Sequence, residues 1–376
     1  MNYKDFIEKN ISKLQQYEIT NITKHKIDYV SNYVDNWLYI IGSNQKCSII
    51  NFIDCMCNAG IYKDGTLTTS MRVLKLFVEH AKANPAKKYN LFLNDYDADR
   101  VDVILELSNI INDENLSNVK VHTACMDVNS YFDFIEENYS EYLNYGSNSI
   151  LFVDPYNFGT VKIKRMKKFV DSHYSELIFN YFSSDYRRNI RNESAIQKIE
   201  RIKESMRGVP GYKESMDEIE VMELIQSYLK ESRLEYSFAY QFRNSRNVPL
   251  YSIIYATPHW RGLEEIKESF WKIFDGNLFY TNDDSNIDQI SLFDEKEINE
   301  ESYLLEAQEL VCSFFDNQRV SYDKILIFVL EHTMLRTGQL IRGVINPLID
   351  EGKIIKQNVS GKKNYKNDIF YISEET

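Results

Sequence analysis

Cys47-Ser48-Ile49-Ile50-Asn51-Phe52-Ile53-Asp54 is the stretch that decides the fold. A short apolar run that ends in an acid is typical of a strand buried on both faces of a parallel sheet. The turn Cys55-Met56-Cys57-Asn58-Ala59-Gly60 follows, and a helical pattern of apolar residues begins near Met71. This succession of strand, tight turn and helix predicts the start of a parallel strand–helix–strand unit.

Four more apolar runs repeat this arrangement along the chain. They predict strands at residues 88–95, 119–122, 149–154 and 176–180, with helical periodicity between them, as at 101–111. Strands that alternate with helices predict an α/β fold with a mostly parallel, doubly wound sheet. In such a sheet, ligands bind at the carboxyl ends of the strands.

Helical segments are predicted before and after these five strands. Apolar residues recur at helical spacing from Ile22 to Ile41, so residues 1–45 are expected to form a helical segment that packs on the core. Residues 184–233 predict polar helices broken near Gly208, as an insertion after the fifth strand.

The sheet is expected to end in an antiparallel hairpin. Residues 236–242 and 251–256 are aromatic and β-branched runs separated by a polar turn. A final antiparallel pair is how the sheets of class I methyltransferases end. The prediction is therefore a Rossmann-like domain over residues 46–275, with the insertion inside it.

The remaining sequence predicts a linker and a small second domain. Residues 276–300 are rich in Asn and Asp and predict the linker. Residues 301–376 predict three short helices and two strands around a Gly-Lys-Lys-Asn tip, which is the order of a winged helix. The helices are expected at 304–315, 322–330 and 337–349, and the strands at 354–355 and 369–372.

Composition narrows the classes of protein that fit. The 376 residues are 43% hydrophobic, which is enough for one large core and one small core. No run of about 18 apolar residues occurs, so no membrane association is expected. Five scattered cysteines make no disulfide framework, and a cytoplasmic location is expected. Because the net charge is −12, any contact with nucleic acid must come from local basic patches.

Acids at the predicted strand ends indicate a cofactor site. Asp54 ends the first strand, Asp95 ends the second, and Asp127 follows the third. A single acid usually caps an element, but three at this spacing beside a turn of small residues suit an adenosyl ligand. The second-strand acid can then accept both ribose hydroxyls. The predicted cofactor-binding residues are Asp54, Cys55, Asn58, Gly60, Asp95 and Asp127.

Asp154-Pro155-Tyr156 follows the fourth strand and predicts the place of chemistry. It puts a carboxylate and a rigid carbonyl beside a flat substrate, with an aromatic ring to stack on it. Hydrogen bonds from an amine to these oxygens favour a tetrahedral nitrogen that faces a methyl sulfonium. We therefore expect Asp154, Pro155 and Tyr156 to be the catalytic residues. The alternative is an ordinary proline turn after a strand.

These landmarks resemble, in order and spacing, a family called the three-Cys-motif partner proteins. Its members are class I methyltransferases encoded near a predicted radical enzyme that supplies the three cysteines. The resemblance implies S-adenosylmethionine (SAM) as cofactor, nucleic acid (DNA or RNA) as substrate and an operon-encoded protein as partner. It covers most of the chain and rests on Thr23-Lys24-His25-Lys26, Asp54 to Gly60, Asp95-Tyr96-Asp97, Asp154-Pro155-Tyr156 and Ala256-Thr257-Pro258-His259.

The turn departs from the family pattern, and this keeps a second hypothesis open. Cys55 and Asn58 stand where the family prefers glycine. Asn tolerates a positive φ better than most residues, but Cys is less forgiving. If the turn no longer reaches the ligand, the chain is a catalytically inactive relative. It would then bind nucleic acid or a protein partner in an operon, for example one for phage defence.

Three basic clusters are candidate contacts with nucleic acid. Lys24 and His25 open the first long helix, and the insertion is rich in arginine. A solvated helix surface is the alternative for these two clusters, and dimerisation or protein docking is the alternative for the third cluster, in the winged helix. The residues predicted to contact nucleic acid are Lys24, His25, Arg187, Arg188, Arg191, Arg336, Arg342, Lys362 and Lys363.

Two metal-dependent alternatives receive less support. Cys55-x-Cys57 has no second Cys or His pair, so it is poor zinc spacing, and no metal site is predicted. A nuclease that uses Asp95 and Asp154 with magnesium is another reading. No acid-x-Lys pair follows a strand, which disfavours it.

Overall fold

The computed structural model describes residues 3–14, 19–144, 146–231, 233–243, 248–277, 279–280, 292–358 and 368–372. The chain divides into two compact units, Met1–His259 and Trp260–Thr376. The first unit contains every residue of the predicted cofactor and catalytic sites. Among the described residues, no helix is long and apolar enough to cross a membrane.

The first unit contains the mostly parallel sheet that the sequence predicted. Its strand order is β3-β2-β1-β4-β5-β7-β6. Strands β1 to β5 pair in parallel, and β7 pairs antiparallel with both β5 and β6, which confirms the predicted closing hairpin. The strands are β1 (Ile49–Asp54), β2 (Lys88–Asp95), β3 (Val119–Cys125), β4 (Ser147–Val153), β5 (Ser175–Tyr181), β6 (Tyr236–Arg243) and β7 (Pro249–Thr257).

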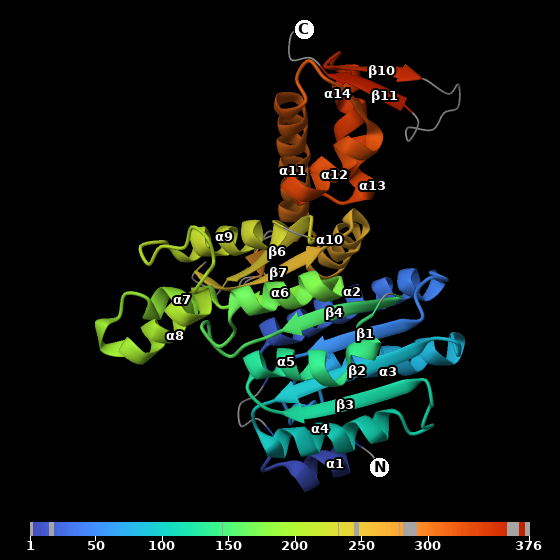
Figure 1. Cartoon of the computed structure of the whole chain (residues 1–376). Coiled ribbons are helices and arrows are strands. Elements are labelled where there is room, and N and C mark those ends of the chain that lie inside the picture. Colours follow the sequence, from blue (N-terminus) through green and yellow to red (C-terminus); the bar gives the residue numbers. More distant parts are fainter. Residues whose placement is uncertain are drawn as a thin grey trace. The chain divides into compact units, whose positions relative to one another are not determined.

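Helices cover both faces of this sheet (Figure 1). Helices α2, α3 and α4 pack in succession on one face, and α5 and α6 lie on the other. This double cover explains why the strands are apolar along their whole length. The helices are α1 (Tyr3–Asn10), α2 (Asn21–Ser43), α3 (Thr69–Ala83), α4 (Ala98–Ile111), α5 (Val128–Asn138), η1 (Ser140–Tyr142) and α6 (Ile163–His173).

The predicted insertion after β5 is helical and packs on the core. Ile202, Val221 and Ile225 belong to the same apolar cluster as α5 and α6. The insertion is therefore an integral part of the first unit. It contains α7 (Ser183–Asn189), η2 (Glu193–Ala195), α8 (Ile196–Met206) and α9 (Glu218–Lys230).

The second unit has helices followed by a hairpin, in the predicted order. A short strand, β9, was not predicted, because three residues are too few to show a period; it pairs with β11. Helix α11 begins at Leu292, inside the predicted linker 276–300, and residues 281–291 lie outside the described residues. The elements are α10 (Trp260–Phe274), β8 (Phe279–Tyr280), α11 (Leu292–Phe314), β9 (Arg319–Ser321), α12 (Tyr322–His332), α13 (Thr337–Leu340), η3 (Ile341–Ile345), α14 (Asn346–Asp350), β10 (Ile354–Asn358) and β11 (Asp368–Ile372).

A buried polar cluster fixes α2 against the sheet. Tyr33 of α2 and Tyr255 of β7 both donate to the carboxylate of Glu176 on β5, Tyr255 at 2.8 Å. The two phenol oxygens lie 2.6 Å apart. Burial raises the pKa of Glu176. Because Tyr33 and Tyr255 are fully buried, water cannot easily replace a hydrogen bond that is lost from this cluster.

Tyr33→Phe should therefore lower the free energy of unfolding by about 1–3 kcal/mol. Urea unfolding followed by circular dichroism measures this change. Tyr39→Phe is the matched control, because Tyr39 lies on the same helix and is 67% exposed. Equal stability of the two variants would show that the cluster does not anchor α2.

Candidate functional site

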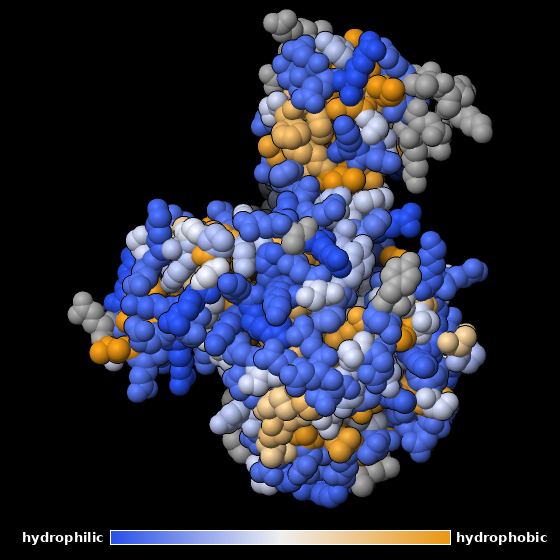
Figure 2. All heavy atoms as spheres, in the orientation of Figure 1, coloured by the Kyte–Doolittle hydropathy of each residue, from blue (hydrophilic) through white to orange (hydrophobic). Residues whose placement is uncertain are grey.

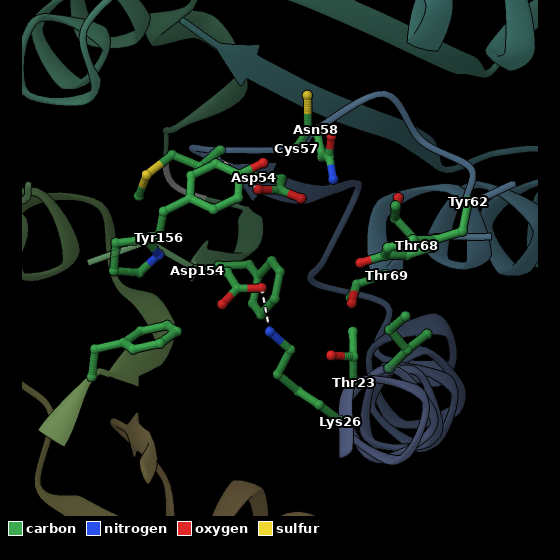
Figure 3. A pocket seen from close by; sticks show the side chains of 15 residues that line it. Thr23, Lys26, Asp54, Cys57, Asn58, Tyr62, Thr68, Thr69, Asp154 and Tyr156 are labelled. Carbon is green, nitrogen blue, oxygen red and sulfur yellow. Dashed lines mark hydrogen bonds and ion pairs between the residues drawn. The ribbon is translucent and has the colours of Figure 1, made fainter. Parts of the chain in front are cut away.

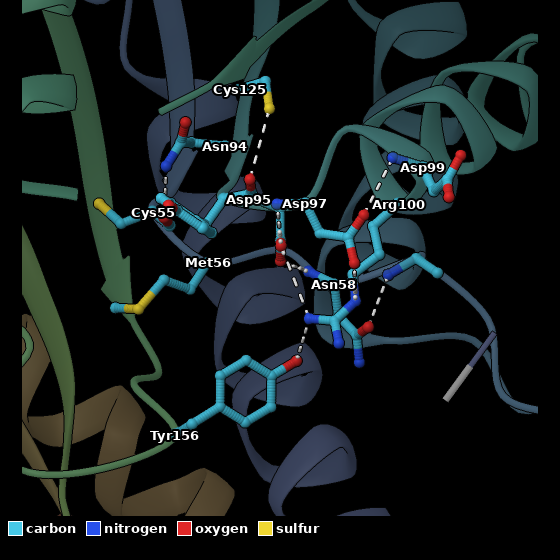
Figure 4. A network of polar contacts seen from close by, with 12 residues as sticks. Cys55, Met56, Asn58, Asn94, Asp95, Asp97, Asp99, Arg100, Cys125 and Tyr156 are labelled. Carbon is cyan, nitrogen blue, oxygen red and sulfur yellow. Dashed lines mark hydrogen bonds and ion pairs between the residues drawn. The ribbon is translucent and has the colours of Figure 1, made fainter. Parts of the chain in front are cut away.

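The end of β2 holds the turn that follows β1 (Figure 4). The Cys57 amide donates to the Asn94 carbonyl at 2.8 Å, and the Asn94 side chain donates to the Cys55 carbonyl at 3.0 Å. The Asn58 amide donates to Asp95 Oδ2 at 2.9 Å. Both side chains on β2 are almost fully buried. The turn is thus tied to β2 by polar groups and does not depend on a glycine-rich sequence.

Asn58 and Gly60 supply the left-handed backbone that this turn needs. Asn58 has φ of 58° and Gly60 has φ of 84°. The Asn58 side chain accepts a hydrogen bond from the Ala59 amide at 2.8 Å, which stabilises the local turn. Gly60 also lies close to Ile104, because a Cβ at this position would be 2.9 Å from the Ile104 side chain. The missing family glycine at Asn58 therefore does not prevent the turn.

The Cys55 side chain leaves the cleft open. It is fully buried in the apolar core, in one cluster with Phe92 and Tyr131. Burial raises the pKa of the Cys55 and Cys57 thiols well above the usual value, so both stay protonated. Met56 and Cys57 line the cavity described next. The structure thus avoids an arrangement in which the Cys55 side chain fills the ligand cleft.

A cavity of about 140 Å³ lies between this turn, α2 and the segment after β4 (Figure 3). The predicted residues Asp54, Asn58, Asp154, Pro155 and Tyr156 all line it. Figure 3 shows Lys26 of α2 and Asp154 pointing toward one another, with a dashed contact between them. The structure therefore brings the first-strand acid, the turn and the fourth-strand motif into one site.

Lys26 lies in this site, although no role there was assigned to it from the sequence. Its Nζ lies 2.6 Å from Asp154 Oδ2, and its side chain is 11% exposed. Helical spacing carried a signal, because Lys26 precedes Val30 by four residues, and Val30 is buried against the core. The amide of Asn180 at the end of β5 donates to Asp154 Oδ1 at 2.6 Å. Both carboxylate oxygens of Asp154 thus have a fixed partner.

Lys24 and His25 are sequence neighbours of residues that line the cavity, but they do not line it themselves. The Lys24 ammonium is 3.1 Å from Asp64, and His25 Nδ1 is 2.9 Å from the Asn21 carbonyl. Thr23 and Lys26 of the same helix line the cavity instead. The reason is the 3.6-residue period of α2, which turns positions 24 and 25 away.

Asp54 is a buried acid at the floor of the cavity. It accepts hydrogen bonds from the Ser70 hydroxyl and, at 3.0 Å, from the Met56 amide. Burial raises its pKa to about 7, and the neighbouring charges of Asp154 and Asp95 add to the increase. A cation in the cavity would therefore be attracted to Asp54 and would favour its ionised form.

A second network joins Asp95 to Tyr156 through Arg100 of α4 (Figure 4). Arg100 Nη1 donates to the Tyr156 hydroxyl at 2.9 Å and lies 3.6 Å from Asp95 Oδ1. The guanidinium also lies over the Tyr156 ring, 5.5 Å from its centroid. Tyr96, directly after Asp95, is 84% exposed. Neither Arg100 nor Tyr96 was singled out from sequence.

Asp127 stabilises the start of helix α5. It is the N-cap of α5, and its Oδ1 accepts from the Asn129 amide at 2.9 Å and the Ser130 amide at 3.3 Å. It does not line the cavity. The sequence could not separate this capping role from a role in ligand binding, because both use an acid after a strand.

The predicted basic contacts are scattered. Arg187 forms an ion pair with Glu218 at 2.7 Å, and Arg336 forms one with Glu268 at 2.9 Å. Arg188 is 3.5 Å from Asp185 and its side chain is 71% exposed. Arg191 and Arg342 are exposed, whereas Lys362 and Lys363 lie outside the described residues.

Comparison with known proteins adds little to this geometry. The sequence matches no protein-family model and no curated protein. A provisionally assigned O-methyltransferase from Klebsiella pneumoniae aligns with a TM-score of 0.35 at 10% identity, covering 68% of this chain and 90% of that one. A geranyl diphosphate methyltransferase solved with sinefungin aligns with a TM-score of 0.25 at 10% identity, covering 60% of this chain and 77% of that one. At such scores the likeness carries no argument, and the fold rests on the strand order.

Gly60→Ala should lower the free energy of unfolding by about 2–4 kcal/mol, because the new Cβ meets Ile104 and the positive φ is strained. Gly338→Ala is the control, since no atom lies within 4 Å of its Cβ position. That control should leave stability unchanged or raise it by up to about 1 kcal/mol. Chemical denaturation of both variants tests this, and a Gly60→Ala protein as stable as the control contradicts the packing argument.

Proposed function

We propose that the chain is a SAM-dependent methyltransferase that methylates an amino group of a nucleic-acid base. The observation that carries the proposal is the shared cavity. Asp54 and residues 56–58 of the turn line the same space as the Asp154-Pro155-Tyr156 motif, so a cofactor on the turn would lie beside an acceptor on the motif. We also propose that the chain belongs with the three-Cys-motif partner proteins, and that an operon-encoded protein is a further partner.

The residues present fit the cofactor. SAM carries a sulfonium and an ammonium group, and the carboxylates of Asp54, Asp95 and Asp154 raise the negative potential of this edge of the sheet. Asp95 accepts hydrogen bonds from two backbone amides, and a carboxylate has about four lone-pair positions. Positions therefore remain for ribose hydroxyls once Arg100 turns aside. When bound, SAM supplies a methyl group that is already activated for transfer.

The chain's own residues would position the acceptor. Asp154 keeps two lone-pair positions beyond its contacts with Lys26 and Asn180, so it can accept a hydrogen bond from an amine. The Pro155 carbonyl would accept the second amine proton. Tyr156 is 49% exposed and offers a ring on which a base can stack. After methyl transfer, Asp154 is the nearest carboxylate to take up the proton that the amine loses.

The second unit is proposed to be a winged helix that holds the polymer. Helix α11, helix α12 and the helical stretch from α13 to α14, followed by the hairpin of β10 and β11, have the order of such a domain. Arg342 is exposed on η3, as a recognition helix requires.

A binding protein without catalysis is the second candidate. One observation favours it: Lys26 already engages Asp154, and Arg100 already engages Asp95. A cofactor must compete with both. Titration of SAM by isothermal calorimetry separates the two candidates, because a micromolar Kd supports the enzyme and no heat at millimolar SAM supports the binding protein.

Label transfer tests the catalytic role of Asp154. We expect the chain to move radiolabelled methyl from SAM to mixed DNA and RNA, and Asp154→Ala to reduce the rate by about 100-fold or more. Asp102→Ala is the control, an exposed acid on α4 that should leave the rate unchanged. Equal labelling by Asp154→Ala removes Asp154 from its role, and label found only on protein rejects the nucleic-acid substrate.

The raised pKa of Asp54 predicts a pH dependence of SAM binding. Below about pH 7 the free carboxyl holds a proton, which must leave before the cationic cofactor gains its charge. The Kd for SAM should therefore rise by up to about tenfold per pH unit from pH 7 to pH 5.5. In Asp54→Asn this slope should disappear, with weaker binding throughout. A slope that persists in Asp54→Asn assigns the titration to another group.

A further inference from the structure

A basic groove lies away from the catalytic cavity, between α6 and the insertion. Its volume is about 760 Å³. Of its lining residues within the described chain, seven are Lys or Arg and only Asp171 and Glu204 are acids. Figure 2 shows strongly hydrophilic side chains gathered over this part of the first unit. Such a concentration is notable in a chain whose net charge is −12.

Some of these cationic side chains already form ion pairs with acids of the same unit. Arg165 contacts Glu136 of α5 at 2.5 Å, and Lys167 contacts Asp171 at 2.8 Å. By contrast, no ion pair within the described residues involves Lys164, Lys168 or Arg233. Lys164 and Lys168 are exposed and lie four residues apart on α6, so they share one face. The positive charge that faces this groove is therefore only partly neutralised.

Helix α8 and its C-cap Arg207 contribute cations both to the groove and to a pocket beside the catalytic cavity. This second pocket, of about 250 Å³, shares Tyr156 with the catalytic cavity and is also lined by Lys198 and Arg201 of α8 and by Asp185. Arg207, just after α8, lines the groove and is 76% exposed, although its guanidinium also contacts Glu204 at 2.8 Å. The segment after the motif is held against α8, since a Cβ on Gly159 would lie 3.1 Å from the Arg201 backbone. Positively charged side chains therefore line the surface from the pocket at Tyr156, along α8, to the groove beside α6.

This arrangement fits a chain of phosphates. Cations that converge on one point suit a single anion, whereas these follow two helices, with Lys164 and Lys168 about 6 Å apart along the α6 axis. Aromatic rings accompany them: Tyr156 at one end, and Tyr228, whose ring lies 5.1 Å from Lys167 Nζ. Cationic grooves with interspersed aromatic rings are how proteins hold single strands. An unpaired base can also enter a cavity that a paired base cannot reach.

We propose that a single-stranded segment of nucleic acid lies along this cationic track, with its phosphates on α8 and α6 and one base at Tyr156. The track comprises Lys198, Arg201, Arg207, Lys164, Lys168 and Arg233. The placement of the base rests on the proposed function. The electrostatic binding of the strand does not, because it needs no cofactor.

Fluorescence anisotropy of the full chain with a labelled oligothymidylate tests the track. Lys164→Gln/Lys168→Gln should weaken binding by about tenfold or more. It should also reduce the magnitude of the salt slope by about 1.4, since each phosphate contact on a single strand contributes about 0.7. Lys88→Gln/Lys120→Gln is the control with the same charge change, because both lysines are exposed at the amino ends of β2 and β3. This control should bind as the unaltered chain does.

Three outcomes overturn the proposal: no loss in the α6 variant, an equal loss in the control, or polyglutamate that binds as tightly with the same dependence on Lys164 and Lys168. The last outcome would assign the groove to an acidic peptide.

SAM titration of the same variants keeps the two proposals apart. Loss of oligonucleotide binding in a chain that never binds SAM supports the track and rejects the methyltransferase. Normal methyl transfer with unaltered oligonucleotide binding in the α6 variant rejects only the track.

Discussion

The polar end of β2 controls the geometry of the whole site. Asn94 and Asp95 are almost fully buried, and they place their oxygens and amide where the turn after β1 needs partners. Asn94 also binds the Met126 backbone after β3, so one side chain joins the turns that follow β1 and β3. Because unsatisfied backbone groups are costly in the interior, these contacts define one course for the turn. Asp54, Asn58 and the cavity take their positions from it.

Acidic and basic side chains gather in different parts of the first unit. The carboxyl ends of the strands gather Asp54, Asp95 and Asp154, and each acid has a different partner: Ser70, Arg100 and Lys26. The face formed by α6 and α8 gathers lysine and arginine instead. A cationic cofactor and a polyanion would then approach the same Tyr156 from regions of opposite potential. Under the two proposals, this separation would let one unit hold both without either field cancelling the other.

The sequence predicted the features that depend on neighbours along the chain. Apolar runs gave the five parallel strands, and the known tolerance of Asn for positive φ gave the course of the turn at Asn58. Contacts between distant segments were out of reach. Nothing local pairs Arg100 with Tyr156, which are 56 residues apart, or Lys26 with Asp154, which are 128 apart. Asp127 is the N-cap of α5, and sequence alone could not tell that role from a ligand contact, because both place an acid after a strand.

The contacts of Asp154 bear on the kind of acceptor the cavity suits. A hydroxyl acceptor must lose its proton as it attacks, so its methylation is helped by a general base such as a neutral histidine. Among the described residues that line the cavity there is no histidine, and Asp154 is held between Lys26 and Asn180. An amine attacks through its lone pair and loses a proton only afterwards, so it needs orientation more than deprotonation. Under the proposed function, the two fixed carboxylate oxygens, with lone pairs to spare, would provide that orientation, and they support an amino group as the proposed acceptor.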